Sequence, residues 1–235
     1  MKRKVHPSIQ QMIEDQAHKW QLHDRERQKS AEPPPPVVYL SRETGANGDL
    51  IAAHLAKITR YDLFDRALIR QIAESGQASE AVVETLDEKT RSALVDWISS
   101  LAEDRHFWFD DYLEHLSKVI GAIGRHGGAI IVGRGAGYLL AKTDCACLRV
   151  RVIASPDTKV KRVMEREHLS AKDAKKHIAK TEGEQRAFLK RYFSADIGEP
   201  RNYDLVLNTD CLSIEEAAEA IRGALVKLAE RPREG

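Results

Sequence analysis

The chain has 235 residues, 42% of them hydrophobic, and its 37 basic side chains nearly balance 36 acidic ones for a net charge of +1. This size suits one α/β domain with an appendage, and the near-neutral charge gives no general attraction to nucleic acid or to a membrane surface. No apolar run reaches the ~20 residues of a membrane helix, no apolar segment follows the basic start at residues 1–4, and three cysteines are too few for a disulfide framework. We therefore expect a cytoplasmic protein whose partners include neither nucleic acid nor membrane.

Residues 1–36 read as an N-terminal arm outside the main domain. Its apolar side chains recur at helical spacing: Ile9, Met12, Ile13, Ala17 and Trp20. This spacing predicts an amphipathic helix over about 7–29, and the four prolines that end the arm predict a stiff polyproline linker. Because a tryptophan on an apolar stripe seldom stays in water, we expect the arm to dock on its own domain or on a second subunit, as in a homodimer. The alternative is a loosely held tail.

From residue 37 to about 230, short apolar segments alternate with helical patterns. The predicted strands are 37–41, 61–64, 128–133, 147–153 and 204–208. The predicted helices are 48–58, 66–75, a helical region over 79–126, 136–141, 156–168, 171–182, 184–193 and 213–230. This alternation predicts an α/β fold with a doubly wound parallel sheet, interrupted by helical insertions over 76–126 and 155–200. In such a sheet, ligands bind beyond the carboxyl ends of the strands.

The first strand leads into a glycine-containing loop and then a helix, which is the arrangement of a phosphate-binding site. The loop reads Ser41-Arg42-Glu43-Thr44-Gly45-Ala46-Asn47-Gly48. Glycines let backbone amides approach a phosphate, and the following helix presents its positive end. Asn47 tolerates a left-handed backbone and can stand in for a glycine. An ordinary tight turn is the alternative.

Two further strand ends carry polar residues. The second strand is followed by Asp65 and Arg66, where the carboxylate either caps the next helix or meets a nucleotide. The third strand ends in Gly133-Arg134-Gly135, which exposes one arginine between glycines. Because a guanidinium fork suits a phosphate, we expect Arg134 to bind an anion.

The segment 155–191 is locally basic, with eleven Lys or Arg residues against six Asp or Glu residues. Arg162 and Arg166 are four residues apart and hence share a helix face, and Arg186 follows in the next helical pattern. We expect the arginines to contact phosphate and most of the lysines to form a solvated surface.

An ordered set of motifs in this chain resembles the cytidylate kinase-like proteins, which are relatives of the P-loop nucleoside monophosphate kinases. The motifs are the loop 41–48, Phe64-Asp65-Arg66, residues 130–135, residues 148–156, residues 162–166 and residues 203–209. Together they cover about 37–228, and the ordered set is more specific than any one of them.

The resemblance implies a P-loop kinase-type fold with a monophosphate-binding insertion at 76–126, a mobile lid at about 168–195, and Mg²⁺-dependent transfer of the ATP γ-phosphoryl group to a nucleoside monophosphate, with CMP or dCMP favoured. The implied ATP- or phosphate-binding residues are Ser41, Arg42, Gly45, Ala46, Asn47, Gly48, Asp49 and Asn208. The implied acceptor-binding residues are Asp65, Arg66, Gly133 and Arg134, and the implied catalytic arginines are Arg162, Arg166 and Arg186.

The loop departs from the standard pattern G-x-x-x-x-G-K-[ST], because Gly48 takes the lysine position and Asp49 the hydroxyl position. Asp49 could hold Mg²⁺ or cap the helix, and Arg42 could replace the missing cation. Three functions stay open: a nucleoside monophosphate kinase, a nucleotide-binding regulatory protein with little catalysis, and another phosphotransferase with a different acceptor.

Overall fold

One five-stranded, all-parallel sheet organises the molecule, in the strand order β2-β3-β1-β4-β5. The computed structural model describes residues 9–30, 33–104 and 107–231. The strands are β1 (Val37–Arg42), β2 (Asp62–Phe64), β3 (Ala129–Val132), β4 (Cys147–Ile153) and β5 (Leu205–Asn208). All five lie where the sequence predicts them, which confirms the α/β, P-loop kinase-type doubly wound fold.

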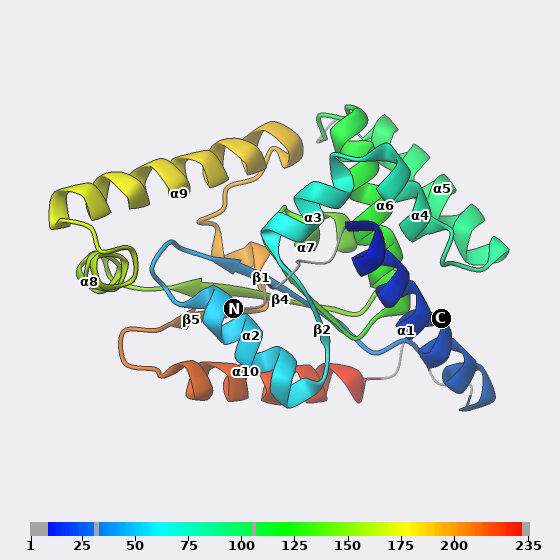
Figure 1. Cartoon of the computed structure of the whole chain (residues 1–235), viewed down its shortest axis with the longest axis horizontal. Coiled ribbons are helices and arrows are strands. Elements are labelled where there is room, and N and C mark those ends of the chain that lie inside the picture. The colour runs from blue at the N-terminus through cyan, green and yellow to red at the C-terminus, as the bar shows by residue number, and fades with distance from the viewer. Residues whose placement is uncertain (1–8, 31–32, 105–106, 232–235) are drawn as a thin grey trace, which may run out of the picture.

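Helices cover both faces of the sheet (Figure 1). The face that carries α2 (Gly48–Thr59) and α10 (Ile214–Ala229) lies opposite the face that carries the two insertions. The first insertion comprises α3 (Arg66–Ala73), α4 (Gly76–Val83), α5 (Glu88–Glu103) and α6 (Asp111–His126), and α7 (Ala136–Leu140) packs beside α6. The second comprises α8 (Pro156–Glu167) and α9 (Ala171–Phe193), and a 3₁₀ turn follows at Pro200–Asn202. Among the described helices, none is long and apolar enough to cross a membrane.

The central strands β1 and β3 are apolar along most of their length because their two faces are buried in different cores. In β1, Val37 and Tyr39 join the core shared with the insertions, while Val38 and Leu40 join the core shared with α2 and α10. Successive side chains of a strand point to opposite faces, and both faces of a parallel sheet are covered. This double burial is why a short apolar run was a sufficient signal for these two strands, whereas the edge strands β2 and β5 are only partly buried.

The second insertion differs from its prediction, because the helices expected at 171–182 and 184–193 form the single helix α9. Gly183 lies inside this helix, where a glycine costs about 1 kcal/mol relative to alanine. The helix nevertheless continues because both of its halves are held by packing. Ile178 packs against α8, and Leu189 belongs to the main core.

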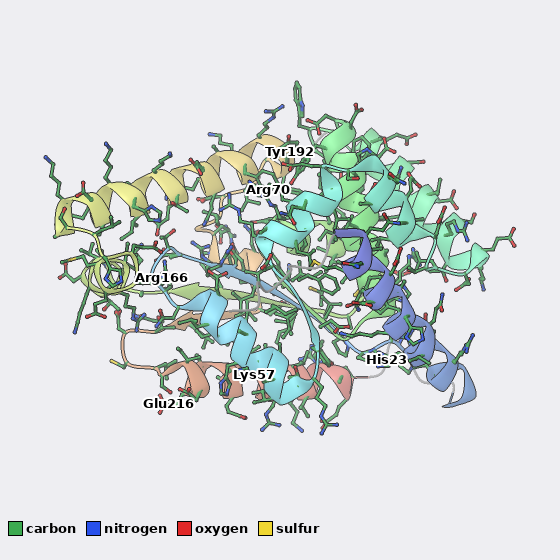
Figure 2. All side chains as sticks on the ribbon, viewed as in Figure 1. His23, Lys57, Arg70, Arg166, Tyr192 and Glu216 are labelled. Carbon is green, nitrogen blue, oxygen red and sulfur yellow. The ribbon has the colours of Figure 1, made fainter. Side chains whose placement is uncertain are left out.

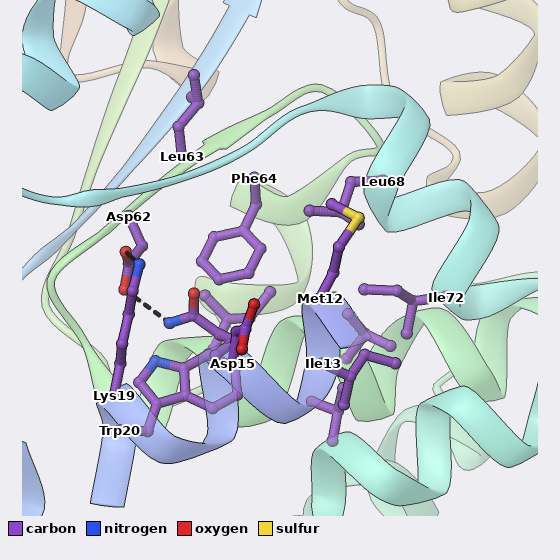
Figure 3. A pocket seen from close by; sticks show the side chains of 14 residues that line it. Met12, Ile13, Asp15, Lys19, Trp20, Asp62, Leu63, Phe64, Leu68 and Ile72 are labelled. Atoms are coloured by element: carbon purple, nitrogen blue, oxygen red, sulfur yellow. Dashed lines mark hydrogen bonds and ion pairs between the residues drawn. The ribbon is translucent and has the colours of Figure 1, made fainter. Parts of the chain in front are cut away.

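The N-terminal helix α1 (Ile9–Ser30) docks on its own domain, at the β2 edge of the sheet. Trp20 is only 3% exposed and stacks on His126, with ring centroids 4.2 Å apart. Gln16 and Lys19 both donate to the carboxylate of Asp62 in β2, over 2.6 and 3.2 Å. Lys19, Trp20 and Asp62 line a cavity of about 310 Å³ that remains between α1, β2 and α3 (Figure 3). The arm therefore covers an edge strand that would otherwise be open.

Replacing Trp20 with alanine should lower the free energy of unfolding by about 3 kcal/mol, because a buried aromatic side chain leaves a cavity. Trp108 is 60% exposed and provides a matched control. Its replacement by alanine should change stability by less than about 0.5 kcal/mol. Chemical denaturation followed by circular dichroism measures both values. Equal losses in the two variants would mean that Trp20 does not anchor the arm.

Candidate phosphate-binding site

The carboxyl end of β1 borders a cavity of about 150 Å³, here called the loop cavity, which lies between the loop 41–48, α3, α8 and α9. Its lining residues are Arg42, Glu43, Thr44, Gly45, Asn47, Gly48, Asp49, Leu50, Arg66, Arg166, His177, Thr181 and Gln185. Seven of these were predicted from the sequence as site residues. This is the edge of a parallel sheet at which ligands bind.

The loop has the backbone geometry that its residues predict. Gly45 has φ +89° and Asn47 has φ 62°, so both occupy conformations that most L-residues avoid. A Cβ added to Gly45 would lie 2.8 Å from the carbonyl oxygen of Lys159, so the loop packs directly on α8. The first amides of α2 have no partner within the helix and carry its positive end, which suits an anion.

Arg42 lies across the position that a standard loop gives to lysine. A Cβ added to Gly48 would be 2.4 Å from the Cβ of Arg42, so only glycine fits beneath this side chain. The Arg42 guanidinium reaches Asp49, with Nε 3.0 Å from Oδ1. It also passes Gly133, where an added Cβ would lie 2.9 Å from Nη1. The glycine at 48 and the missing lysine thus have one cause, which is the path of Arg42.

Three guanidinium groups converge at a second, smaller space of about 30 Å³, here called the inner cavity. Its lining residues are Tyr39, Ser41, Arg42, Arg66, Gly133, Arg134, Gly135, Gln185, Phe188, Leu189 and Ile197. Arg134 has φ 55°, and its guanidinium lies 5.6 Å from the centroid of the Phe188 ring. Its Nε donates to the carbonyl oxygen of Arg66 over 3.5 Å. The two cavities share Arg42, Arg66 and Gln185 and so are neighbours.

The arginines of the inner cavity are electrostatically strained. Burial, and after it the charge of Arg42, lowers the pKa of Arg66. Burial also lowers the pKa of Arg134, and the neighbouring positive charge of Arg66 acts in the same direction. An anion placed among these groups would relieve both effects, because it supplies the opposite charge that favours the protonated form. The arrangement therefore favours a phosphate.

One carboxylate and one hydroxyl that line the loop cavity are relevant to metal binding. Asp49 is exposed, and its carboxylate is paired with Arg42 at the mouth of the loop cavity. The Oγ1 atom of Thr44 is buried and has no hydrogen-bond partner among the described residues. Within those residues there is no cluster of three or more histidine, cysteine or acidic side chains that could hold a metal ion. A divalent cation here would therefore need oxygen atoms from a bound phosphate as well.

Two predicted site residues lie beneath the loop instead of lining a cavity. Arg162 donates to both the hydroxyl and the carbonyl of Thr209, over 2.9 and 2.6 Å, and its Nη1 lies 3.4 Å from the carbonyl oxygen of Gly45. Ala46 is fully buried, and its carbonyl accepts the Thr209 hydroxyl over 3.1 Å. These contacts hold the loop against the end of β5.

Three more predicted residues lie outside both cavities. Asp65 caps α3 by accepting the amide of Leu68 over 2.8 Å, which is the capping role weighed for it. Asn208 is exposed and accepts the amide of Asp210 over 3.0 Å. The Arg186 side chain is 56% exposed, lies 3.9 Å from Glu182, and is not among the residues that line either cavity.

The sequence interpretation missed the side chains that α9 presents to the loop. His177, Thr181 and Gln185 line the loop cavity and are spaced by four residues, so they share one helix face. The four-residue spacing could have indicated this helix face, but the prediction for this segment considered only its arginines and lysines. Of the three arginines implied to be catalytic, Arg166 from α8 is the one that lines this cavity, and Figure 2 shows it beside α8 and below α9.

A parallel α/β sheet with a phosphate-type loop after its first strand, two helical insertions and an arginine cluster at the strand ends defines a P-loop kinase-type protein. The chain belongs to the cytidylate kinase-like family, because the profile of that family matches residues 37–211.

Individual relatives are more distant. A cytidylate kinase of Sulfolobus acidocaldarius is 35% identical over 78 residues, which are 33% of this chain and 43% of that protein. A cytidylate kinase of Methanocorpusculum labreanum is 29% identical over 102 residues, 43% of this chain and 56% of that protein. The matches thus span about half the length of these relatives. A crystal structure of an uncharacterized protein from Eubacterium ventriosum has the same fold, with a TM-score of 0.57 at 20% identity, covering 81% of this chain and 98% of that one.

Proposed function

We propose that this protein transfers the γ-phosphoryl group of ATP to a nucleoside monophosphate, with CMP or dCMP as the favoured acceptor. The observation that carries the proposal is the convergence of Arg42, Arg66 and Arg134 beside a glycine loop and the first turn of α2. Phosphoryl transfer needs alignment and positive charge on the phosphate oxygens, and little covalent chemistry from the protein. Membership of the cytidylate kinase-like family and the names of the two relatives support the choice of acceptor.

The two cavities suggest how the substrates would be arranged. The loop cavity lies against the loop amides and α2, so it would take the ATP phosphates. The inner cavity, with Arg66 and Arg134, would take the phosphate of the acceptor. Arg42 borders both cavities and would therefore lie between donor and acceptor. That is where negative charge is concentrated during transfer.

Substrate binding would require α9 to move. Ligand sites for molecules of this size are about 300–1,000 Å³, which is larger than either cavity. Gln185, Phe188 and Leu189 of α9 fill the space beside the arginines. We infer that α9 acts as the lid, opening to admit nucleotides and closing again to exclude water.

One residue of the loop cavity suits the triphosphate of ATP, and another suits Mg²⁺. The buried Thr44 hydroxyl lacks a partner and lines the loop cavity, so it would gain one from a triphosphate oxygen. Asp49 is the carboxylate that would hold Mg²⁺, and it would then have to release Arg42. Bound Mg²⁺ would supply charge neutralisation on the phosphates. Arg42, once released from Asp49, would remain the cation that borders both the loop cavity and the inner cavity.

The test is a coupled assay of ADP release with ATP and Mg²⁺ against CMP, dCMP, UMP, AMP and GMP, with calorimetric binding of each on the same sample. Turnover with CMP or dCMP supports the proposal. Turnover with another nucleotide alone rejects the acceptor assignment and keeps the reaction. Binding without turnover favours the second candidate, a nucleotide-binding regulatory protein, for which the missing lysine and the Asp49–Arg42 pair are the favouring observations. Absence of binding contradicts both.

Two exposed arginines of the second insertion, Arg166 and Arg186, should differ in their effect on turnover. Arg166 lines the loop cavity, so Arg166→Ala should lower kcat by about tenfold, or about 1.4 kcal/mol of transition-state stabilisation. Arg186→Ala should change kcat by less than about twofold, because an exposed ion pair contributes little. Steady-state kinetics at saturating substrates measures both. A larger loss for Arg186 would mean that α9 rotates on closing.

A further inference from the structure

A buried lysine joins the phosphate loop to α9. Lys159, in the first turn of α8, is 8% exposed. Its Nζ donates to Glu43 Oε2 in the loop over 3.0 Å and to Glu182 Oε1 in α9 over 2.9 Å. Its carbonyl oxygen lies against Gly45 of the loop, as described above. Three elements far apart in the sequence thus meet at one ammonium group.

The charges of this network are closely matched. Burial alone would lower the pKa of Lys159, but the hydrogen bonds to Glu182 and Glu43 outweigh it and raise that pKa, so the ammonium stays charged. Glu43 has a second cation in Arg151, 3.8 Å away, and Arg151 is itself fixed by a 2.7 Å bond to Ser41. A carboxylate within a phosphate loop would repel a phosphate, and these cations neutralise it.

The position of Glu182 gives the network a second role. Glu182 lies between Thr181 and Gln185, which line the loop cavity from α9. The bond from Lys159 therefore fixes the segment of α9 that covers the loop. Among the described residues, Lys159 is the only group whose ion pairs join the loop 41–48 to α9.

We propose that Lys159 is a positioning residue that couples the two halves of the site, holding α9 over the phosphate loop and neutralising the loop carboxylate of Glu43. This deepens and rests on the proposed function, since α9 is taken to be the lid of a nucleotide site. Lys159 would not touch the substrate. It would set both the closed population of α9 and the affinity of the loop for a triphosphate.

The experiment compares Lys159→Met, Lys159→Arg and the triple variant Lys159→Met/Glu43→Gln/Glu182→Gln with the parent chain. Lys161→Met, an exposed lysine two residues along α8, is the matched control. Two readouts are taken: hydrogen exchange of α9 without nucleotide, and the dissociation constant of ATP with Mg²⁺ by calorimetry. The first does not depend on any activity.

Lys159→Met should speed exchange over 177–189 and weaken ATP binding by about tenfold each, within the usual range of coupling between sites. Lys159→Arg should retain most of both properties. The triple variant should regain ATP affinity, because it no longer leaves two carboxylates without their cation, but should keep the fast exchange. Lys161→Met should match the parent chain.

Unchanged exchange and unchanged ATP affinity in Lys159→Met would overturn the proposal, and so would a triple variant that binds ATP no better than Lys159→Met. If Lys159→Met does not fold, Glu182→Gln serves in its place, and unchanged α9 exchange in that variant would also reject the coupling. If exchange and affinity respond as expected but no monophosphate is phosphorylated, the coupling stands and the proposed function fails.

Discussion

Arg42→Ala is expected to lower kcat/KM for ATP by about 10³-fold, the effect of removing a main electrostatic contact to a transferring phosphoryl group. Arg42 borders both cavities, and its side chain passes over Gly48, which takes the lysine position of the standard loop. Steady-state kinetics with varied ATP measures the loss. Arg222→Ala, which removes an exposed arginine of α10 paired with Glu219, is the matched control and should leave kcat/KM unchanged.

The same argument predicts a rescue. Gly48→Lys alone should inactivate the protein, because a Cβ at this position meets Arg42 Cβ at 2.4 Å. In Arg42→Gly/Gly48→Lys both the Cβ and the Cγ of residue 42 are gone, and the new lysine can supply the missing charge. We expect this double variant to have a kcat/KM at least about tenfold above that of Arg42→Gly, since energies of contacting residues do not add. A double variant no better than Arg42→Gly would show that Arg42 does not substitute for the lysine.

Arg134→Ala is expected to raise KM for the acceptor by about 10²-fold, the lower end of the cost of removing one partner of a buried charge contact. KM for ATP should change much less, because Arg134 borders the inner cavity and not the loop cavity. The separation of the two KM values tests the assignment of the two cavities. Thermal unfolding checks the fold, since Arg134 also contacts Phe188 and the Arg66 carbonyl.

An equal rise in both KM values would contradict that assignment. So would an unchanged acceptor KM, which would remove Arg134 from the site. Lys should be a poor replacement for Arg134, because an ammonium cannot form the two parallel bonds that a guanidinium forms with a phosphate. Arg134→Lys is therefore expected to lie nearer to Arg134→Ala than to the parent chain.

The sequence alone was enough to predict the fold, and it predicted the strand ends as the place of the candidate site. The central strands β1 and β3 are short apolar runs buried on both faces, so composition and length were enough to find them. The left-handed Asn47 and the glycine of the loop were also readable, since turn chemistry depends on a few adjacent residues. The capping role of Asp65 was readable for the same reason.

Only the tertiary structure decided which side chains face the cavities. Arg162 turned out to bind Thr209, 47 residues away, and Lys159 to bind Glu43, 116 residues away. Arg186 is exposed and lines neither cavity, whereas Gln185 beside it lines both. Helix and strand periodicity is encoded within a few residues, but the direction of a long charged side chain is set by partners from distant elements. Their positions exist only after the sheet and its insertions have packed.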